Sequence, residues 1–199
     1  MKILYQGNEG AYSQLAAAEI FPNASLISCK TFEDCFKQCV NDKTLRTIIP
    51  IENSIAGRVA DIQYLMNKYK LQIYAEHFHK VSHNLIAIPG VKLNNLKYVR
   101  SHSQAISQCQ KLINQYKLEP IIAADTAGSA KYISKNLIKD EAAIASTLAA
   151  KIYNLEVLKH NIEDDKKNVT RFLFMGKKIE HPEYKKNEKF ITSCIFKVK

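Results

Sequence analysis

The feature that most constrains the fold is an alternation of short apolar runs with stretches of helical composition. In the first half of the chain, the expected strands are 3–5, 25–28 and 47–51, and the expected helices are 13–21, 31–40 and 59–69. Strands that alternate with helices form largely parallel sheets, because each helix packs on the sheet that its flanking strands extend. The pattern therefore predicts an α/β fold.

A second series follows an extended stretch from 71 to 88 and a turn at Pro89 and Gly90. Its expected strands are 98–100, 121–124 and 142–145, its expected helices are 103–116, 126–136 and 146–153, and a late strand spans 169–175. Extended crossings near residues 78 and 165 join the two series, as in folds that hold a ligand in a cleft between two lobes. We expect lobe one at about 1–78 plus 165–180, and lobe two at about 79–164.

Composition fits a cytoplasmic protein with a packed core. The 199 residues are 46% hydrophobic, and the apolar start at 1–6 is followed at once by Gly7 rather than by a signal-peptide cleavage site. No segment approaches the roughly 20 apolar residues of a membrane helix. Five irregularly spaced cysteines fit reduced thiols in a cytosol. We expect no membrane partner.

The formal net charge of +10 raises nucleic acid as a partner. The lysines are scattered along the chain, however, and neither an RNA-reading aromatic motif nor a zinc finger is present. A positive field can also steer a small anion, and a lysine-rich surface can simply keep a protein soluble. We expect a small-molecule ligand and no nucleic acid.

Three histidines lie on or near one extended segment: His77, His79 and His83. A His-x-His pair can bind a metal ion, but no acid or cysteine completes the set at the usual sequence spacing. The sequence therefore predicts no metal site.

Polar residues follow several of the expected strands, where open α/β sheets keep their ligand sites. Backbone N–H groups in the turn after Gly7 could hold an anion. Each of the other segments alone is an ordinary helix cap, but together they indicate one site. The candidate residues are Gly7, Asn53, Ser54, Ser101, Gln104, Gln108 and Thr126.

The start of the late strand places a hydroxyl, Thr170, next to a guanidinium, Arg171. Arginine suits a carboxylate because it makes a planar two-point contact that lysine cannot copy. A surface arginine in an ordinary strand remains the alternative. Phe172 follows directly and completes this candidate segment.

Together these segments resemble the prephenate dehydratase family, which includes the related arogenate dehydratases. The matching segments are YQG at 5–7, GAYS at 10–13, PIENS at 50–54, NL at 84–85, PGV at 89–91, SHSQA at 101–105, QC at 108–109, DTAG at 125–128 and NVTRF at 168–172. They follow the family's order over about residues 3 to 176. The chain departs from the family at Ser103, usually proline, and at Asn84, usually cysteine.

The resemblance implies a two-lobed fold like that of periplasmic binding proteins of type II, a homodimer and no cofactor. It implies that Thr170 donates or relays a proton to the leaving hydroxyl of prephenate, with help from Arg171. It further implies two groups of substrate-binding residues. The carboxylates would be held by Arg171, Asn53, Ser54, Ser101 and amides after Gly7, and further hydrogen bonds would come from Gln104, Gln108 and Thr126.

Two alternatives remain open: an arogenate dehydratase, and a non-catalytic protein of the same fold that binds a small anion. The charged stretch 181–189 is expected to be a linker, and 190–199 resembles the first strand of an ACT domain. Because family members use that domain to bind phenylalanine, we expect no phenylalanine feedback from this chain.

Overall fold

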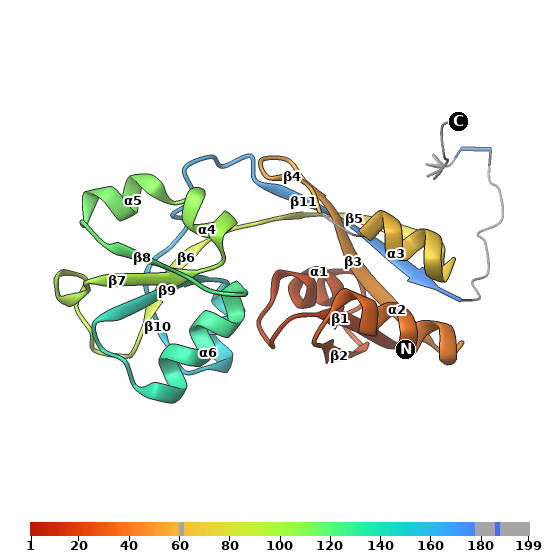
Figure 1. Ribbon diagram of the computed structural model, residues 1–199, viewed down its shortest axis with the longest axis horizontal. Coiled ribbons are helices and arrows are strands. Elements are labelled where there is room, and N and C mark those ends of the chain that lie inside the picture. The colour runs from red at the N-terminus through yellow and green to blue at the C-terminus, as the bar shows by residue number, and fades with distance from the viewer. Residues whose placement is uncertain (60–61, 178–185, 188–199) are drawn as a thin grey trace.

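The computed structural model describes residues 1–59, 62–177 and 186–187. These residues form two lobes side by side, each built on its own β-sheet (Figure 1). The predicted α/β fold with two lobes is confirmed. The expected linker and ACT strand lie outside the described residues, apart from 186–187.

The first lobe has a six-stranded sheet with the order β2-β1-β3-β11-β5, in which β4 pairs with β3. Its strands are β1 (Lys2–Gln6), β2 (Ser25–Cys29), β3 (Leu45–Asn53), β4 (Gly57–Arg58), β5 (Gln72–Lys80) and β11 (Val169–Gly176). Strands β1, β2 and β3 are parallel, whereas β11 is antiparallel to both β3 and β5. The chain therefore returns from the second lobe to complete the first.

Helices cover both faces of this sheet. Helix α1 (Tyr12–Ile20) packs on the face that carries Phe172 and Phe174, whereas α2 (Phe32–Asn41) and α3 (Ile62–Tyr69) pack on the face that carries Leu173 and Met175. Because side chains alternate along a strand, Thr170 belongs to the α1 face and Arg171 to the opposite face.

The second lobe has a five-stranded sheet with the order β10-β6-β9-β7-β8. Its strands are β6 (Asn84–Ala87), β7 (Tyr98–Ser101), β8 (Glu119–Ile122), β9 (Glu141–Ala145) and β10 (Glu156–Lys159). The helices are η1 (Leu93–Asn95), α4 (Ser103–Ser107), α5 (Gln110–Gln115), α6 (Thr126–Asn136) and α7 (Thr147–Ile152). Alanines in α6, α7 and β9 form much of one core cluster, so these elements approach closely.

Two elements differ from their predictions. The expected helix 103–116 is broken into α4 and α5, because the N–H of Asp164 donates to the carbonyl of Gln108 at 2.7 Å. The expected helix start at residue 59 is wrong, since β4 turns back on β3 and the N–H of Val59 donates to the carbonyl of Ile51. Both differences arise from partners that are distant in sequence or in the next strand.

The lobes also meet at the loop before α1. The hydroxyl of Ser146 donates to the carbonyl of Gly10 at 2.6 Å, and Tyr153 donates to the carbonyl of Glu9 at 2.9 Å. Gly10 has φ +88°, and a Cβ there would lie 2.6 Å from the Cα of Ala149. Glycine is therefore required where the two lobes touch.

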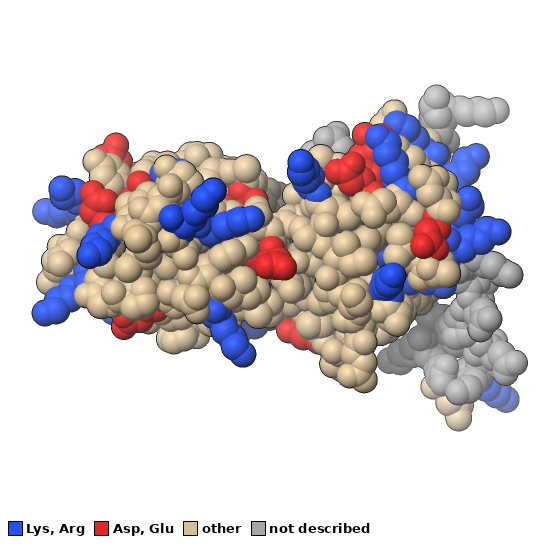
Figure 2. All heavy atoms as spheres, turned by 90° about the horizontal axis from the view of Figure 1, so that it is seen from below, with Lys and Arg blue, Asp and Glu red and all other residues tan. Residues whose placement is uncertain are grey.

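On the face shown in Figure 2, Lys and Arg side chains are spread over both lobes with acidic side chains between them. That distribution differs from the single basic patch of a typical nucleic-acid-binding surface. Within the described ranges, no helix combines the length and the apolar character needed to cross a membrane.

Candidate active site

A polar network lies where the two lobes are connected. It begins at Thr170, the second residue of β11, which sits directly opposite Asn53 at the end of β3. Asn53 Nδ2 donates to Thr170 Oγ1 at 3.0 Å. Because Thr170 accepts this bond, its own hydroxyl proton remains available for donation to another group.

The carboxamide of Asn53 is held on both sides. Its Oδ1 accepts from the N–H groups of Ile55 and Ala56 at 3.0 and 2.8 Å, which fixes the turn after β3. Its Nδ2 also donates to Asn168 Oδ1 at 2.7 Å. Asn53 is thereby a positioning residue for Thr170, since its bonding capacity is used within the protein.

Asn168 continues the network into the second lobe. This side chain is fully buried, and its Nδ2 donates to Gln108 Oε1 at 2.8 Å. Gln108 Oε1 also lies 2.9 Å from His83 Nε2. Since an amide oxygen only accepts, His83 must carry a proton on Nε2.

The protonation state of His83 determines the direction of the hydrogen bonds at the end of the network. Burial lowers the pKa of His83, so the ring is neutral at neutral pH and Nδ1 is an acceptor. The Tyr12 hydroxyl lies 2.9 Å from that Nδ1 and 2.9 Å from the carbonyl of Ser82, so its one proton is shared between these two acceptors, while burial raises the pKa of Tyr12 well above its ordinary value. The polar network consists of Thr170, Asn53, Asn168, Gln108, His83 and Tyr12.

A cavity of about 290 Å³ lies between the lobes. Side chains of both lobes line it, including Tyr12, Glu19, His79, Lys80, Asn84 and His160. His79 is the direct cross-strand neighbour of Thr170 on the same sheet face. The cavity wall is therefore one strand away from the Thr170 hydroxyl.

Arg171 lies apart from this network. Its Nε donates to Glu76 Oε2 at 2.8 Å, its Nη2 lies 2.7 Å from the same oxygen, and its guanidinium lies 5.8 Å from the ring centroid of Phe78. The expectation that Arg171 assists Thr170 has no support in this geometry, because neighbours in a strand point to opposite faces.

Three other candidate side chains make their contacts within the protein. Ser101 is fully buried and donates to the carbonyl of Ile144 at 2.7 Å, and Phe172 is buried in the core beneath α1. Ser54 donates to the carbonyl of Lys167 at 2.7 Å. In this conformation each of these residues is therefore engaged in a structural contact.

The remaining candidates are separated from the network. The N–H of Gly7 donates to the carbonyl of Cys29 at 3.0 Å, so this amide is already used. Gln104 is exposed at the start of α4, and Thr126 is half-buried at the start of α6 beside its N-cap, Asp125. The structure thus brings together only Thr170, Asn53 and Gln108 among the predicted residues.

The sequence interpretation missed three members of the network: Tyr12, His83 and Asn168. Tyr12 and Asn168 lie within the matching segments, so their position was available as a signal. His83 was weighed only as a metal ligand, and its burial follows from contacts with Gln108 and Tyr12 that sequence spacing does not show.

Asn84, one of the two positions at which the sequence departs from the expected pattern, lines the cavity. Its Oδ1 lies 3.2 Å from His160 Nδ1, and its Nδ2 donates to the carbonyl of Ala145 at 3.2 Å. The asparagine therefore ties the cavity wall to β9 through bonds that a thiol would make only weakly.

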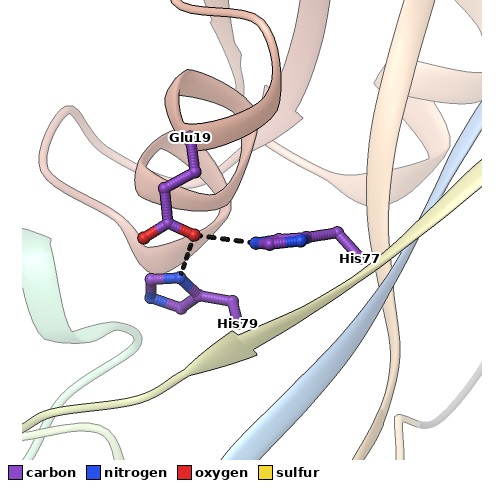
Figure 3. A group of neighbouring side chains, drawn as sticks. All are labelled: Glu19, His77 and His79. Atoms are coloured by element: carbon purple, nitrogen blue, oxygen red, sulfur yellow. Dashed lines mark hydrogen bonds and ion pairs between the residues drawn. The ribbon is translucent and has the colours of Figure 1, made fainter.

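A second group of side chains brings to two histidines an acid that does not lie at the usual sequence spacing. Glu19 of α1 lies between His77 and His79 of β5 (Figure 3), with Oε2 at 2.7 Å from His77 Nε2 and 3.0 Å from His79 Nδ1. Partial burial would raise the pKa of Glu19, but hydrogen bonds from the two histidines lower it overall. This group could not be recognised from sequence spacing, because Glu19 lies 58 residues before His77.

The fold and the site define a two-lobed α/β domain with a small-molecule cavity and a buried polar network beside it. The prephenate dehydratase family model matches residues 3–180, and the chain belongs to this family.

Curated relatives are similar over nearly the whole chain. Arogenate dehydratase 2 from Petunia hybrida is 39% identical over 196 residues, which cover 98% of this chain and 49% of the relative. A bifunctional N-acyl-homoserine lactone acylase/prephenate dehydratase from Komagataeibacter europaeus is 36% identical over 88% of this chain and 63% of its own. The chain spans about half the length of the plant relatives that it matches.

Two solved structures share the fold. Prephenate dehydratase from Arthrobacter aurescens, in complex with L-Phe, superposes with a TM-score of 0.85 at 26% identity over 93% of this chain and 63% of its own. A quorum-quenching acylase superposes with a TM-score of 0.85 at 34% identity over 92% of this chain and 67% of its own.

Proposed function

We propose that this chain is the catalytic domain of a prephenate dehydratase, which converts prephenate to phenylpyruvate. The observation that carries the proposal is the Thr170 hydroxyl, which accepts from Asn53 at 3.0 Å and sits one strand from the cavity wall. Membership of the prephenate dehydratase family supports the same reaction class. The substrate is a small dianion, and the enzyme is a carbon–oxygen lyase.

The chemistry requires little more than orientation and one proton. The bond to the ring carboxylate breaks and releases carbon dioxide, its electron pair enters the ring, and the bond to the ring hydroxyl breaks. One proton is consumed as the hydroxyl leaves as water, and the ring becomes aromatic, which supplies the driving force. Thr170 relays that proton to the leaving oxygen, with its geometry set by Asn53.

Cations near the cavity attract and hold the dianion. Lys80 lines the cavity, and the net charge of +10 provides a general positive field. The assignment of Arg171 to a substrate carboxylate stays a prediction, and it requires the guanidinium to leave Glu76 when substrate binds.

Arogenate is the second candidate substrate. Several relatives at 36–39% identity over 98% of the chain are arogenate dehydratases, and arogenate differs from prephenate by an amino group in place of the side-chain keto oxygen. The same proton relay serves both substrates, so the choice depends on how the cavity receives that group.

The proposal also places the chain in the cytoplasm as a homodimer, without nucleic-acid or membrane partners. A non-catalytic protein that binds a small anion in the same cleft is the rival reading. It differs from the proposal in predicting ligand binding without turnover.

The test is product formation from both substrates at neutral pH. Phenylpyruvate is followed by its enolate absorbance in alkali, and phenylalanine formed from arogenate is separated by chromatography. We expect phenylpyruvate from prephenate. Phenylalanine as the favoured product would assign arogenate, and a folded protein that binds prephenate without turnover would support the anion-binding protein.

A further inference from the structure

We propose that Glu19, His77 and His79 form a binding site for a divalent transition metal ion, with Zn²⁺ as the best match. The three ligand atoms come from two elements, α1 and β5, and all lie within 4.8 Å of one another. Figure 3 shows both imidazole rings directed at the same carboxylate oxygen.

The ligand set decides which ions fit. Two imidazole nitrogens and one carboxylate oxygen are the set that holds zinc in sites that keep a fourth position open. Imidazole nitrogen favours zinc, copper and nickel, whereas magnesium and calcium prefer sites made of oxygen alone. The group therefore selects a borderline transition metal.

The spacing of the two histidines places both of them on one face of β5. His77 and His79 are two residues apart, so both point to the α1 face of the first sheet, where Glu19 approaches from the helix. Ring centroids of the two histidines lie 6.3 Å apart. Two ligands are thus fixed by β5, and only the third depends on the docking of α1.

A small movement of the carboxylate would bring its distances to the two histidine nitrogens to those of a metal site. The carboxylate oxygen is 2.7 and 3.0 Å from the two nitrogens, whereas tetrahedral ligands at zinc distances lie about 3.4 Å apart. The Glu19 side chain is 49% exposed and can withdraw by the few tenths of an ångström required. Each imidazole then presents a lone pair to the ion and carries its proton on the other ring nitrogen.

The ligand cluster borders the cavity. Glu19 and His79 line the 290 Å³ cavity, and the side chains of His79 and His77 are 7% and 25% exposed. His79 is therefore buried and held rigidly. The Glu19 carboxylate is more accessible, so a metal ion can enter from that side. Water, or a carboxylate of a molecule in the cavity, takes the fourth position.

The rival explanation is a structural one, in which Glu19 accepts two hydrogen bonds and ties α1 to β5 without a metal. It predicts that removal of one histidine changes stability but that added zinc changes nothing. The two explanations differ in metal stoichiometry, which is independent of whether the protein turns over prephenate or arogenate.

The test titrates the chelator-treated full chain with Zn²⁺ by calorimetry and with Co²⁺ by visible absorption. We expect one ion per chain, with the intense bands of tetrahedral Co²⁺ that Zn²⁺ displaces. His77→Gln and Glu19→Gln should each weaken zinc binding by about 100-fold. His160→Gln, which changes another cavity histidine, should leave it unchanged.

The proposal would be overturned by the absence of saturable zinc binding, by only the weak bands of octahedral Co²⁺, or by equal affinity in wild type and His77→Gln. Because His77 is partly exposed, its variant should fold, and circular dichroism of each variant checks this. A fully folded Glu19→Gln variant with undiminished affinity would likewise exclude the site.

Discussion

Thr170 and Arg171 are neighbours in sequence, yet they lie in different environments on opposite faces of β11. Thr170 belongs to a neutral network of amides, a histidine and a tyrosine, whereas Arg171 pairs with Glu76 beside Phe78. In this conformation the two side chains therefore point away from each other. The orientation of the Thr170 hydroxyl comes from Asn53, and Lys80 lines the cavity.

Among the residues that position Thr170, the largest effect is expected from Asn53→Asp. This change keeps an oxygen for the N–H groups of Ile55 and Ala56 but removes the amide that donates to Thr170. We expect turnover of prephenate to fall by about 100-fold while the fold is retained. The measurement is kcat, with circular dichroism as the check on folding.

Near-normal kcat in Asn53→Asp would show that turnover does not depend on the orientation of Thr170 by Asn53. Ser54→Ala is the matched control, because it changes the next residue and removes only a hydroxyl bound to backbone atoms of 167 and 169. Its kcat should change by less than about threefold.

Asn168→Ala tests whether the network also supports the fold. The side chain is fully buried, and its removal takes one partner from Asn53 and one from Gln108. We expect a loss of about 1–3 kcal/mol in the free energy of unfolding, measured by urea denaturation. A loss below about 0.5 kcal/mol would show that water replaces the amide at little cost.

The network should also make stability depend on pH through His83. Burial lowers its pKa in the folded state below the ordinary 6.5, so the unfolded chain binds the proton more readily. Stability is complete above about pH 6.5 and decreases as the pH falls toward the folded-state pKa. In His83→Gln this pH-dependent part of the stability should vanish. The measurement compares urea midpoints of both proteins at about pH 7.5 and about pH 5.5. An unchanged pH dependence would contradict a neutral buried His83.

The smallest effect belongs to the opposite face. Arg171→Gln and Glu76→Gln should each cost about 1 kcal/mol of unfolding free energy, and the double variant should lose no more than either alone. If Arg171 does not contact the substrate, the KM for prephenate should be the same in both single variants. A rise in KM confined to Arg171→Gln would instead assign the guanidinium to a substrate carboxylate.

Periodicity predicted much of the fold because most of the relevant physics is local. Apolar runs such as 47–51 and 142–145 became buried strands β3 and β9, and the late apolar run became β11. The break between α4 and α5 could not be predicted, since it depends on a bond from Asp164, far along the chain.

The site was predictable only in part. Thr170, Asn53 and Gln108 follow from the matching segments, and the network joins all three. The opposite orientation of Arg171 follows from the two-residue period of a strand. The union of Glu19 with two histidines of β5 depends on how α1 docks, which the spacing of residues does not reveal.

The proton relay at Thr170 is tested most directly by a comparison of Thr170→Ala with Thr170→Ser in the conversion of prephenate to phenylpyruvate. Serine keeps the hydroxyl that Asn53 orients, whereas alanine removes it. We expect the alanine variant to fold and bind prephenate but to lose about 100-fold or more in kcat, while the serine variant keeps most of the turnover. Near-normal kcat in Thr170→Ala would contradict a proton relay at this residue.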